Sequence, residues 1–178
     1  VAQVWSKKLG VGAPIRPLPA IALGSFEATP YEMATAYNVL ANEGLKVEPV
    51  TITRVADERD RVLEQHHAPV PERVVHAESA FLVTDMLRSV INEGTAASAR
   101  GMDFRPEAAG KTGTTNDYRD AWFCGFTPDL LAVVWVGFDD NTPVGLSGTK
   151  AALPIWVDFM KAATSGQRSS PFPPSAPR

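Results

Sequence analysis

The chain of 178 residues has few of the residues on which disulfide and metal chemistry depends. Cys124 is the only cysteine, so an internal disulfide is impossible, and its apolar neighbours predict a buried, inert thiol. The three histidines are His66, His67 and His76, and none has Cys, Asp or Glu at the spacing of metal ligands. We therefore expect no metal site and no cofactor.

Excess charge of one sign and long apolar runs are also absent. The formal net charge is −3, which provides no general attraction to nucleic acid or to an anionic membrane. No apolar run approaches the length of a membrane span, and the first residues do not resemble a signal peptide. Because the chain begins with Val1 and not with Met, we expect a piece of a longer protein whose anchor or export signal lies upstream.

The chain does contain enough apolar sequence for one folded domain, with 44% hydrophobic residues. Residues 29–32 (Thr-Pro-Tyr-Glu) form a capping box with proline at the first helical position, which predicts a helix over 29–43. Gly44 is suited to the left-handed position that follows such a helix. Partial alternation over 47–63, interrupted by a polar turn at 57–60, predicts a small hairpin.

Later periodicities predict a helix over 76–91 and a last helix over 155–163. The expected apolar face of the first of these helices consists of Ala80, Val83, Met86, Leu87 and Val90. The expected sheet-facing side of the last helix consists of Ile155, Trp156, Phe159 and Met160. Between Gly94 and Met102, a run of small residues is expected to form a short helix or a loop.

Three strands are expected at 108–114, 120–126 and 130–138, and a Thr-Pro-Asp turn favours a hairpin between the last two. Residues 130–138 are apolar on both alternations, which is typical of a central strand buried on both faces. The proline- and serine-rich residues 166–178 predict an extended or disordered tail, so we expect the domain to cover residues 1–165.

The first of these strands contains the most informative segment, residues 111–115 (Lys-Thr-Gly-Thr-Thr). A lysine beside threonine hydroxyls is suited to hold a carboxylate, and a glycine there lets a ligand lie close to the strand. Two other interpretations apply to the short motif alone. A phosphate-binding P-loop would need a glycine where Arg105 stands and a helix after the motif. An ordinary strand with exposed Lys and Thr is the simpler alternative.

The longer segment 109–123 (Ala-Gly-Lys-Thr-Gly-Thr-Thr-Asn-Asp-Tyr-Arg-Asp-Ala-Trp-Phe) closely resembles the transpeptidase domain of class A, bifunctional penicillin-binding proteins. Further segments resemble the same family in the same order, at residues 23–30, 93–96, 135–140 and 151–156. The resemblance implies an α+β fold of the serine β-lactamase and penicillin-binding type. The chain would be a fragment of that fold with antiparallel strands and a closing C-terminal helix.

The chain departs from the family's pattern in the part that carries the nucleophile. The family has an S-x-x-K motif and then S-x-N, both upstream of K-T-G, and this chain has neither of them there. Its one S-x-x-K is Ser147-Gly148-Thr149-Lys150, which follows Lys111 in a glycine-rich loop, and we interpret it as coincidence. We expect the chain to be the C-terminal part of a transpeptidase domain whose nucleophile-bearing half is missing.

The resemblance also implies a role for each residue of the motif. Lys111 provides positive potential near a substrate carboxylate, Thr112 and Thr114 bind it through their hydroxyls, and Gly113 keeps the strand edge open. The backbone N–H of Thr114 is expected to be one of two oxyanion donors. The alternatives are a surface lysine that lies along the sheet and threonines selected for strand propensity. The polar residues 116–120 are expected to form a solvated turn beside the site, with substrate contact as the alternative.

The implied reaction is the cross-linking of peptidoglycan stem peptides through a serine acyl-enzyme, and β-lactams would acylate the same serine. The expected partners are stem peptides, β-lactams and the missing N-terminal half of the domain, at the extracytoplasmic face of the bacterial inner membrane. No nucleic acid is expected. Two other classes stay open, a β-lactamase or β-lactam sensor of the same fold and a non-catalytic binding module. The chain alone is expected to be inactive, and stable only beside its missing half.

Overall fold

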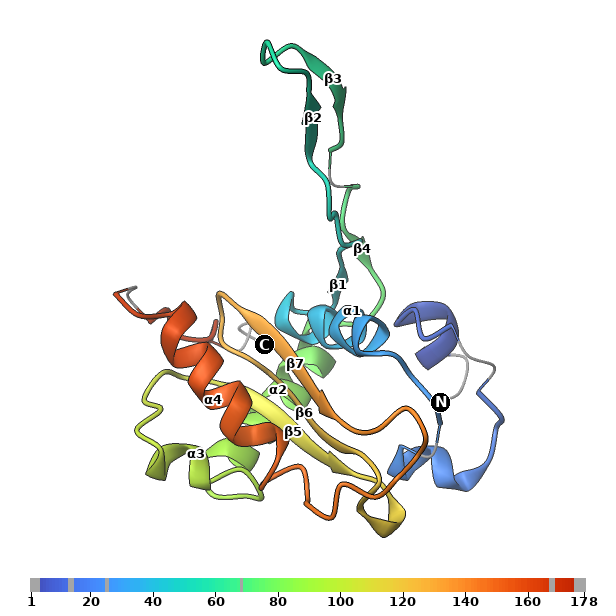
Figure 1. Ribbon diagram of the computed structural model, residues 1–178, viewed down its shortest axis with the longest axis vertical. Coiled ribbons are helices and arrows are strands. Elements are labelled where there is room, and N and C mark those ends of the chain that lie inside the picture. Colours follow the sequence, from blue (N-terminus) through green and yellow to red (C-terminus); the bar gives the residue numbers. More distant parts are fainter. Residues whose placement is uncertain (1–3, 13–14, 25, 68, 167–168, 175–178) are drawn as a thin grey trace.

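A long β-hairpin projects from the body of the molecule, which consists of helices around a small sheet (Figure 1). The computed structural model describes residues 4–12, 15–24, 26–67, 69–166 and 169–174. The body contains the long helices α1 (Pro30–Ala41), α2 (Ala77–Asn92) and α4 (Ala152–Ala163) and the short helix α3 (Ser98–Gly101). Two short helical segments, η1 (Val4–Lys8) and η2 (Pro19–Leu23), precede α1. No helix in the described residues is long and apolar enough to cross a membrane.

The body contains a three-stranded sheet of β5 (Ala109–Thr114), β6 (Ala121–Phe126) and β7 (Leu131–Val136), in that spatial order. Neighbouring strands are antiparallel, and Cys124 of β6 lies opposite Lys111 on one side and Val133 on the other. The three strands agree with the expected ranges to within two residues, and the predicted hairpin between the last two is confirmed. The α+β class is confirmed as well.

The prediction that residues 130–138 form a central strand is wrong within the described chain. The central strand is β6, nearly all of which is buried, whereas β7 lies at the edge and its residues are half-buried or exposed. Apolar side chains on both alternations are typical of a strand in a sheet that is covered on both faces. The composition of β7 fits this description, because α1 and α4 both contact this strand.

The hydrophobic core lies where α4 packs on the sheet. Trp156 of α4 is fully buried and contacts the rings of Phe104 and Phe123 edge-on, at centroid distances of 5.2 and 4.9 Å. Its indole N–H donates to the carbonyls of Gly125 and Ala132, each at 3.2 Å, and so connects α4 to both β6 and β7. In Figure 1, α4 lies in front of the sheet and α2 behind it.

The expected start of α1 is confirmed in detail. Thr29 is the N-cap residue, and its side chain and that of Glu32 form the reciprocal hydrogen bonds of a capping box. The helix ends at Ala41, two residues before the predicted end, and Gly44 has the positive φ of 90° that was expected of it. A side chain at Gly44 would also clash, because its Cβ would lie 2.2 Å from the carbonyl oxygen of Val75.

α2 confirms the helix expected over 76–91, but its buried face agrees with the predicted one only in part. The buried residues are Ala80, Thr84 and Ile91. Val83 and Met86, which were expected to be buried, are 36% and 62% exposed, and Leu82 beside them is 62% exposed. The small side chains of Ala80 and Thr84 allow a close approach to the body, which apolar periodicity does not reveal. α2 therefore has a second apolar stripe, Leu82-Val83-Met86, that faces away from the core.

The last helix begins at Ala152, three residues before the predicted start, and the side that faces the sheet is only partly the predicted one. Its buried residues are Ala152, Leu153, Trp156, Val157 and Met160. The predicted positions of Trp156 and Met160 are confirmed, whereas those of Ile155 and Phe159 are wrong, since each is 51% exposed. Pro154 does not prevent the earlier start, because proline is tolerated in the first turn of a helix.

The expected hairpin is confirmed and is longer than predicted. At its base, β1 (Leu45–Lys46) pairs with β4 (Glu72–Arg73), and further out β2 (Arg54–Ala56) pairs with β3 (Val62–Gln65). We call the residues 45–73 the hairpin arm. The arm connects α1 to α2 and reaches far from the sheet (Figure 1).

Two short segments complete the fold. The run of small residues after Gly94 contains α3, which decides between the helix and the loop left open by the sequence. Residues 169–174 have no helix or strand, and the ring of Phe172 contacts that of Phe126 edge-on at 5.8 Å. The domain boundary at residue 165 and disorder within the tail stay predictions.

Candidate functional site

The candidate site lies where β5 leaves the core. Ala109 and Gly110 are buried at its start, whereas Lys111 and Thr114 are exposed. A Cβ at Gly110 would lie 2.8 Å from the carbonyl oxygen of Cys124 and 2.9 Å from the ring of Phe123, so only glycine fits there. This close approach holds the first half of β5 against β6 and brings the second half, with its polar side chains, to the surface.

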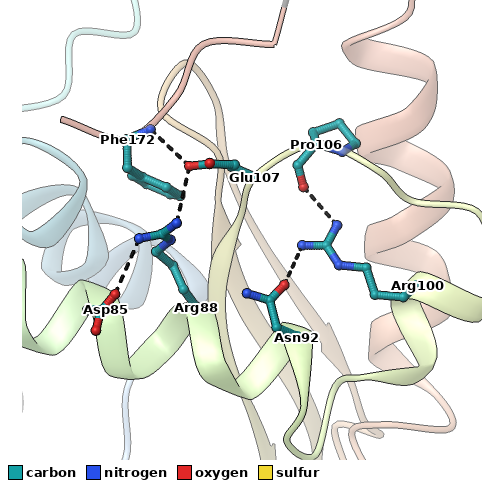
Figure 2. Close-up of polar contacts among 7 residues, drawn as sticks. All are labelled: Asp85, Arg88, Asn92, Arg100, Pro106, Glu107 and Phe172. Carbon is teal, nitrogen blue, oxygen red and sulfur yellow. Dashed lines mark hydrogen bonds and ion pairs between the residues drawn. The ribbon is translucent and has the colours of Figure 1, made fainter. Parts of the chain in front are cut away.

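Arg100 of α3 positions the segment that leads into β5 (Figure 2). Its guanidinium donates to the carbonyls of Phe104 at 2.8 Å and Pro106 at 2.9 Å, and to the side-chain oxygen of Asn92 at 2.7 Å. Burial lowers the pKa of Arg100 below its ordinary value, and the nearby charge of Arg105 acts in the same direction. Three acceptor oxygens compensate for this desolvation, since hydrogen bonds to charged groups are stronger than neutral ones.

Lys111 and Thr112 form the centre of the site. The Lys111 ammonium donates to the carbonyl of Thr112 at 2.9 Å and lies 3.4 Å from its hydroxyl. The hydroxyl of Thr112 is also 3.1 Å from that of Thr95, and the Thr149 hydroxyl donates to the carbonyl of Thr95 at 3.2 Å. Sequence reasoning did not identify Thr95 or Thr149, because they lie in separate loops and no local pattern connects them to β5.

Thr114 is held by a loop that follows β7. The backbone N–H of Gly148 donates to the Thr114 hydroxyl oxygen at 3.0 Å, which leaves the hydroxyl proton of Thr114 free to donate. A Cβ at Gly148 would lie 2.5 Å from the carbonyl oxygens of both Gly113 and Trp122, so this loop needs glycine to reach the strand. A Cβ at Gly113 would lie 3.1 Å from that of Trp122, a tight contact that gives Gly113 a packing reason besides any role toward a ligand.

The turn after β5 is polar and exposed, as expected for a solvated turn. Thr115 and Asp120 close it, with the Asp120 N–H donating to the Thr115 hydroxyl at 2.8 Å. The Asp120 carboxylate accepts from the indole N–H of Trp135 on β7 at 2.9 Å. The backbone N–H groups of Val144 and Gly145 both donate to the carbonyl of Tyr118, at 2.8 and 3.2 Å. The site therefore has a rim of two connected turns.

The other sequence candidates lie outside this centre. Ser147 and Lys150 are joined through their backbones, since the Lys150 N–H donates to the Ser147 carbonyl at 2.9 Å. Cys124 is buried as predicted, and burial raises the pKa of its thiol to about 12, which makes it a poor nucleophile. No group of three metal-ligating side chains occurs in the described parts of the chain.

The arrangement is suited to bind an anion beside an extended chain. In the described residues β5 pairs with β6 alone, so its other edge has backbone groups available for a ligand strand. One ammonium and the hydroxyls of Thr112 and Thr114 lie at that strand end. These groups can bind and polarise a ligand, but none of them has a neighbouring general base that would activate it as a nucleophile.

Comparison with known proteins identifies the family. The family described as "Penicillin binding protein transpeptidase domain" matches residues 17–161 of this chain. Penicillin-binding protein 1A of Aquifex aeolicus is 43% identical over 160 residues, which are 89% of this chain and 22% of that protein. Penicillin-binding protein 1B of Vibrio cholerae is 36% identical over 167 residues, 93% of this chain and 21% of that protein. The chain thus spans about a fifth of the length of these relatives.

Solved structures agree with the sequence comparison. Penicillin-binding protein 1A of Haemophilus influenzae superposes with a TM-score of 0.87 at 27% identity, over 95% of this chain and 31% of that one. PonA1 of Mycobacterium tuberculosis in complex with penicillin V superposes with a TM-score of 0.76 at 27% identity, over 91% of this chain and 44% of that one. The chain belongs to the family of penicillin-binding protein transpeptidase domains, and its relatives are the class A members 1A and 1B.

Proposed function

We propose that this chain is part of a peptidoglycan D,D-transpeptidase, which cross-links stem peptides through a serine acyl-enzyme and binds β-lactams. The observation that carries the proposal is the exposed end of β5, where Lys111, Thr112 and Thr114 present one cation and two hydroxyls along a free strand edge. The PonA1 structure, which contains penicillin V, supports the β-lactam part of the proposal.

In this proposal the terminal carboxylate of the substrate binds at Lys111. The ammonium supplies positive charge, and the hydroxyls of Thr112 and Thr114 donate to the carboxylate oxygens. The Gly148 N–H supports this role, because it occupies a lone pair of the Thr114 oxygen and so directs the hydroxyl proton outward. The substrate backbone lies along β5 as an added strand, next to Gly113.

The chemical step needs two further groups. The backbone N–H of Thr114 is one donor of the oxyanion hole, and the N–H of the nucleophilic serine is the other. That serine and its lysine partner belong to the missing N-terminal half of the domain. The chain by itself is therefore expected to bind without catalysing.

The missing half docks on two surfaces that the described chain leaves open. One is the edge of β7, which pairs with β6 alone in the described residues and so has backbone groups available for a further strand. The other is the exposed stripe Leu82-Val83-Met86 on α2, since a helix that is apolar on two sides is typically buried between layers. Because peptidoglycan lies outside the cytoplasmic membrane, we place the complete domain on the extracytoplasmic face of that membrane, held by an anchor in another part of the protein.

Labelling of the full-length parent protein with a fluorescent penicillin tests the function. We expect covalent labelling of a serine upstream of Val1, identified by mass mapping of the labelled peptide. Lys111→Ala should slow labelling by about 10- to 100-fold, because it removes a hydrogen bond to a charged group. Lys150→Ala is the matched control, since it removes an exposed lysine from the neighbouring loop and should leave the rate unchanged.

Each other outcome changes the assignment. Labelling at Ser147 would overturn the assignment of the nucleophile to the missing half. Absence of labelling would place the protein among non-catalytic binding modules. Rapid turnover of the penicillin, with release of the hydrolysed product, would place it among β-lactamases.

A further inference from the structure

A groove on the side of the body, away from β5's exposed end, holds the segment 169–174. The groove is lined by the end of α1, by α2 and by the turn after β6, and the tail residues Pro171, Phe172 and Pro173 lie in it. The ring of Phe172 is the anchor. It contacts the buried Phe126 edge-on at 5.8 Å on one side, and the guanidinium carbon of Arg88 lies 5.4 Å from its centroid on the other.

Three polar side chains lie beside this ring, and we call Asp85, Arg88 and Glu107 the polar clamp (Figure 2). Arg88 donates to Asp85 at 3.3 Å and to Glu107 at 3.5 Å, so its position over the ring is held from two sides. The same Glu107 oxygen accepts the backbone N–H of Phe172 at 3.1 Å. Further along the tail, the Ser170 hydroxyl donates to the Asp129 carboxylate at 3.1 Å.

The clamp matches the chemistry of a proline-rich peptide. In the segment 171–174 (Pro-Phe-Pro-Pro), Phe172 has the only backbone N–H, because proline has none. Glu107 satisfies that single donor, and the flanking prolines restrict φ, so the segment loses little conformational freedom when it binds. The groove therefore recognises three features together: an aromatic ring, one N–H and an extended proline-rich backbone.

The tail does not fill the groove completely. A cavity of about 50 Å³ remains beside Phe172, with Thr84 of α2 in its wall. Thr84 is 7% exposed, and its hydroxyl has no hydrogen-bond partner among the described residues. A buried hydroxyl without a partner is unfavourable, so the tail leaves this part of the groove wall unsatisfied.

We propose that this groove is a peptide-recognition site for an aromatic residue flanked by proline, which the protein's own tail occupies in cis and a separate peptide of the same kind occupies in trans. The proposal is independent of the transpeptidase assignment, because no residue of the Lys111 site takes part. It implies that the tail binds reversibly across α1, α2 and the end of β6, and that a separate peptide can displace it.

A fluorescent peptide with the sequence of residues 169–174 tests the proposal by anisotropy titration against the full-length protein. We expect saturable binding to the Phe172→Ala variant, whose groove is free, and binding that is at least about tenfold weaker to the unmodified protein, whose groove is filled. A peptide with alanine in place of its phenylalanine should not bind. Phe159→Ala is the matched control, because this exposed phenylalanine lies on α4 and its loss should leave binding as in the unmodified protein.

A second measurement covers the case in which Phe172→Ala disturbs folding. Ser170→Ala removes the hydrogen bond from the tail to Asp129 and leaves the side chains of the groove unchanged, so it should weaken binding of the tail in cis and increase peptide binding in trans. Hydrogen exchange of the Phe172 amide should become faster in the same variant. Equal binding of the peptide to all variants, or none to any of them, would overturn the proposal.

Discussion

The sheet and the hairpin arm are both antiparallel β-structure, but different forces hold them. In the sheet, Phe123 of β6 is fully buried against Trp156 of α4, and helices lie in front of the strands and behind them (Figure 1). In the arm, every residue of β3 is exposed, including Leu63 at 59%. The arm depends on strand pairing and on surface ion pairs such as Arg54–Asp60 at 2.6 Å. The difference shows that the register of a hairpin is specified locally, whereas the position of β5 and its site depends on packing.

The largest expected effect is in the core. Trp156→Ala removes the indole that packs on Phe104 and Phe123 and that bridges β6 and β7, and it should destabilise the complete transpeptidase domain by about 3–5 kcal/mol. Leu63→Ala in the arm should change the free energy of unfolding by less than about 0.5 kcal/mol. Denaturant titration of both variants measures the contrast, and equal losses would contradict it.

The second-largest effect is expected at Arg100, which holds the segment that leads into β5. Arg100→Ala leaves three oxygens without their donor and should cost about 1–3 kcal/mol of unfolding free energy. Arg100→Lys should recover only part of this, because an ammonium cannot reproduce the fork of a guanidinium. If the lysine variant is as stable as the unmodified domain, charge and not geometry positions the segment.

A smaller effect is expected at the start of α1, the helix that leads into the arm. Glu32→Ala removes the capping box and should cost about 1 kcal/mol. Hydrogen bonds from the N–H groups of Thr29 and Gly12 hold the pKa of Glu32 below its ordinary value of 4.5. A lowered pKa in the folded state means that this stabilisation is present above pH 4.5 and is lost as the pH falls further. The difference between Glu32→Ala and the unmodified domain should therefore shrink below that pH.

The smallest effect is expected in the arm itself. Arg54→Ala breaks the ion pair with Asp60, whose side chain is 80% exposed, and should cost about 0.2–1 kcal/mol. Because salt screens exposed charges, the cost should disappear at about 1 M salt, where the screening length is near 3 Å. Arg59→Ala in the same turn serves as the charge-matched control. If the loss of unfolding free energy persists in high salt, side-chain packing and not the ion pair stabilises the arm at this position.

Local patterns were sufficient for much of the fold. The capping box at Thr29 and Glu32 and the Thr-Pro-Asp turn between the last two strands depend on residues close together in the chain, and both were predicted correctly. Helix faces were predicted less well, because hydrophobicity placed Met86 and Ile155 inside, whereas small residues such as Thr84 and Ala152 take buried positions that were not predicted. A small side chain allows two elements to approach closely, and that advantage depends on which element lies opposite.

The amino-acid sequence by itself determined the secondary structure, the family and the motif at Lys111, because each is specified by residues close together in the chain. Only the tertiary structure decided that Thr95 contacts Thr112, that Gly148 holds Thr114 and that Phe172 lies beneath Arg88. Each of these contacts joins a loop or the tail to a strand or helix from another part of the chain, and it exists only where packing of the helices on the sheet brings the two segments together. Local periodicity cannot predict that packing, because it depends on the residues of one helix or strand and not on the surface against which that element packs.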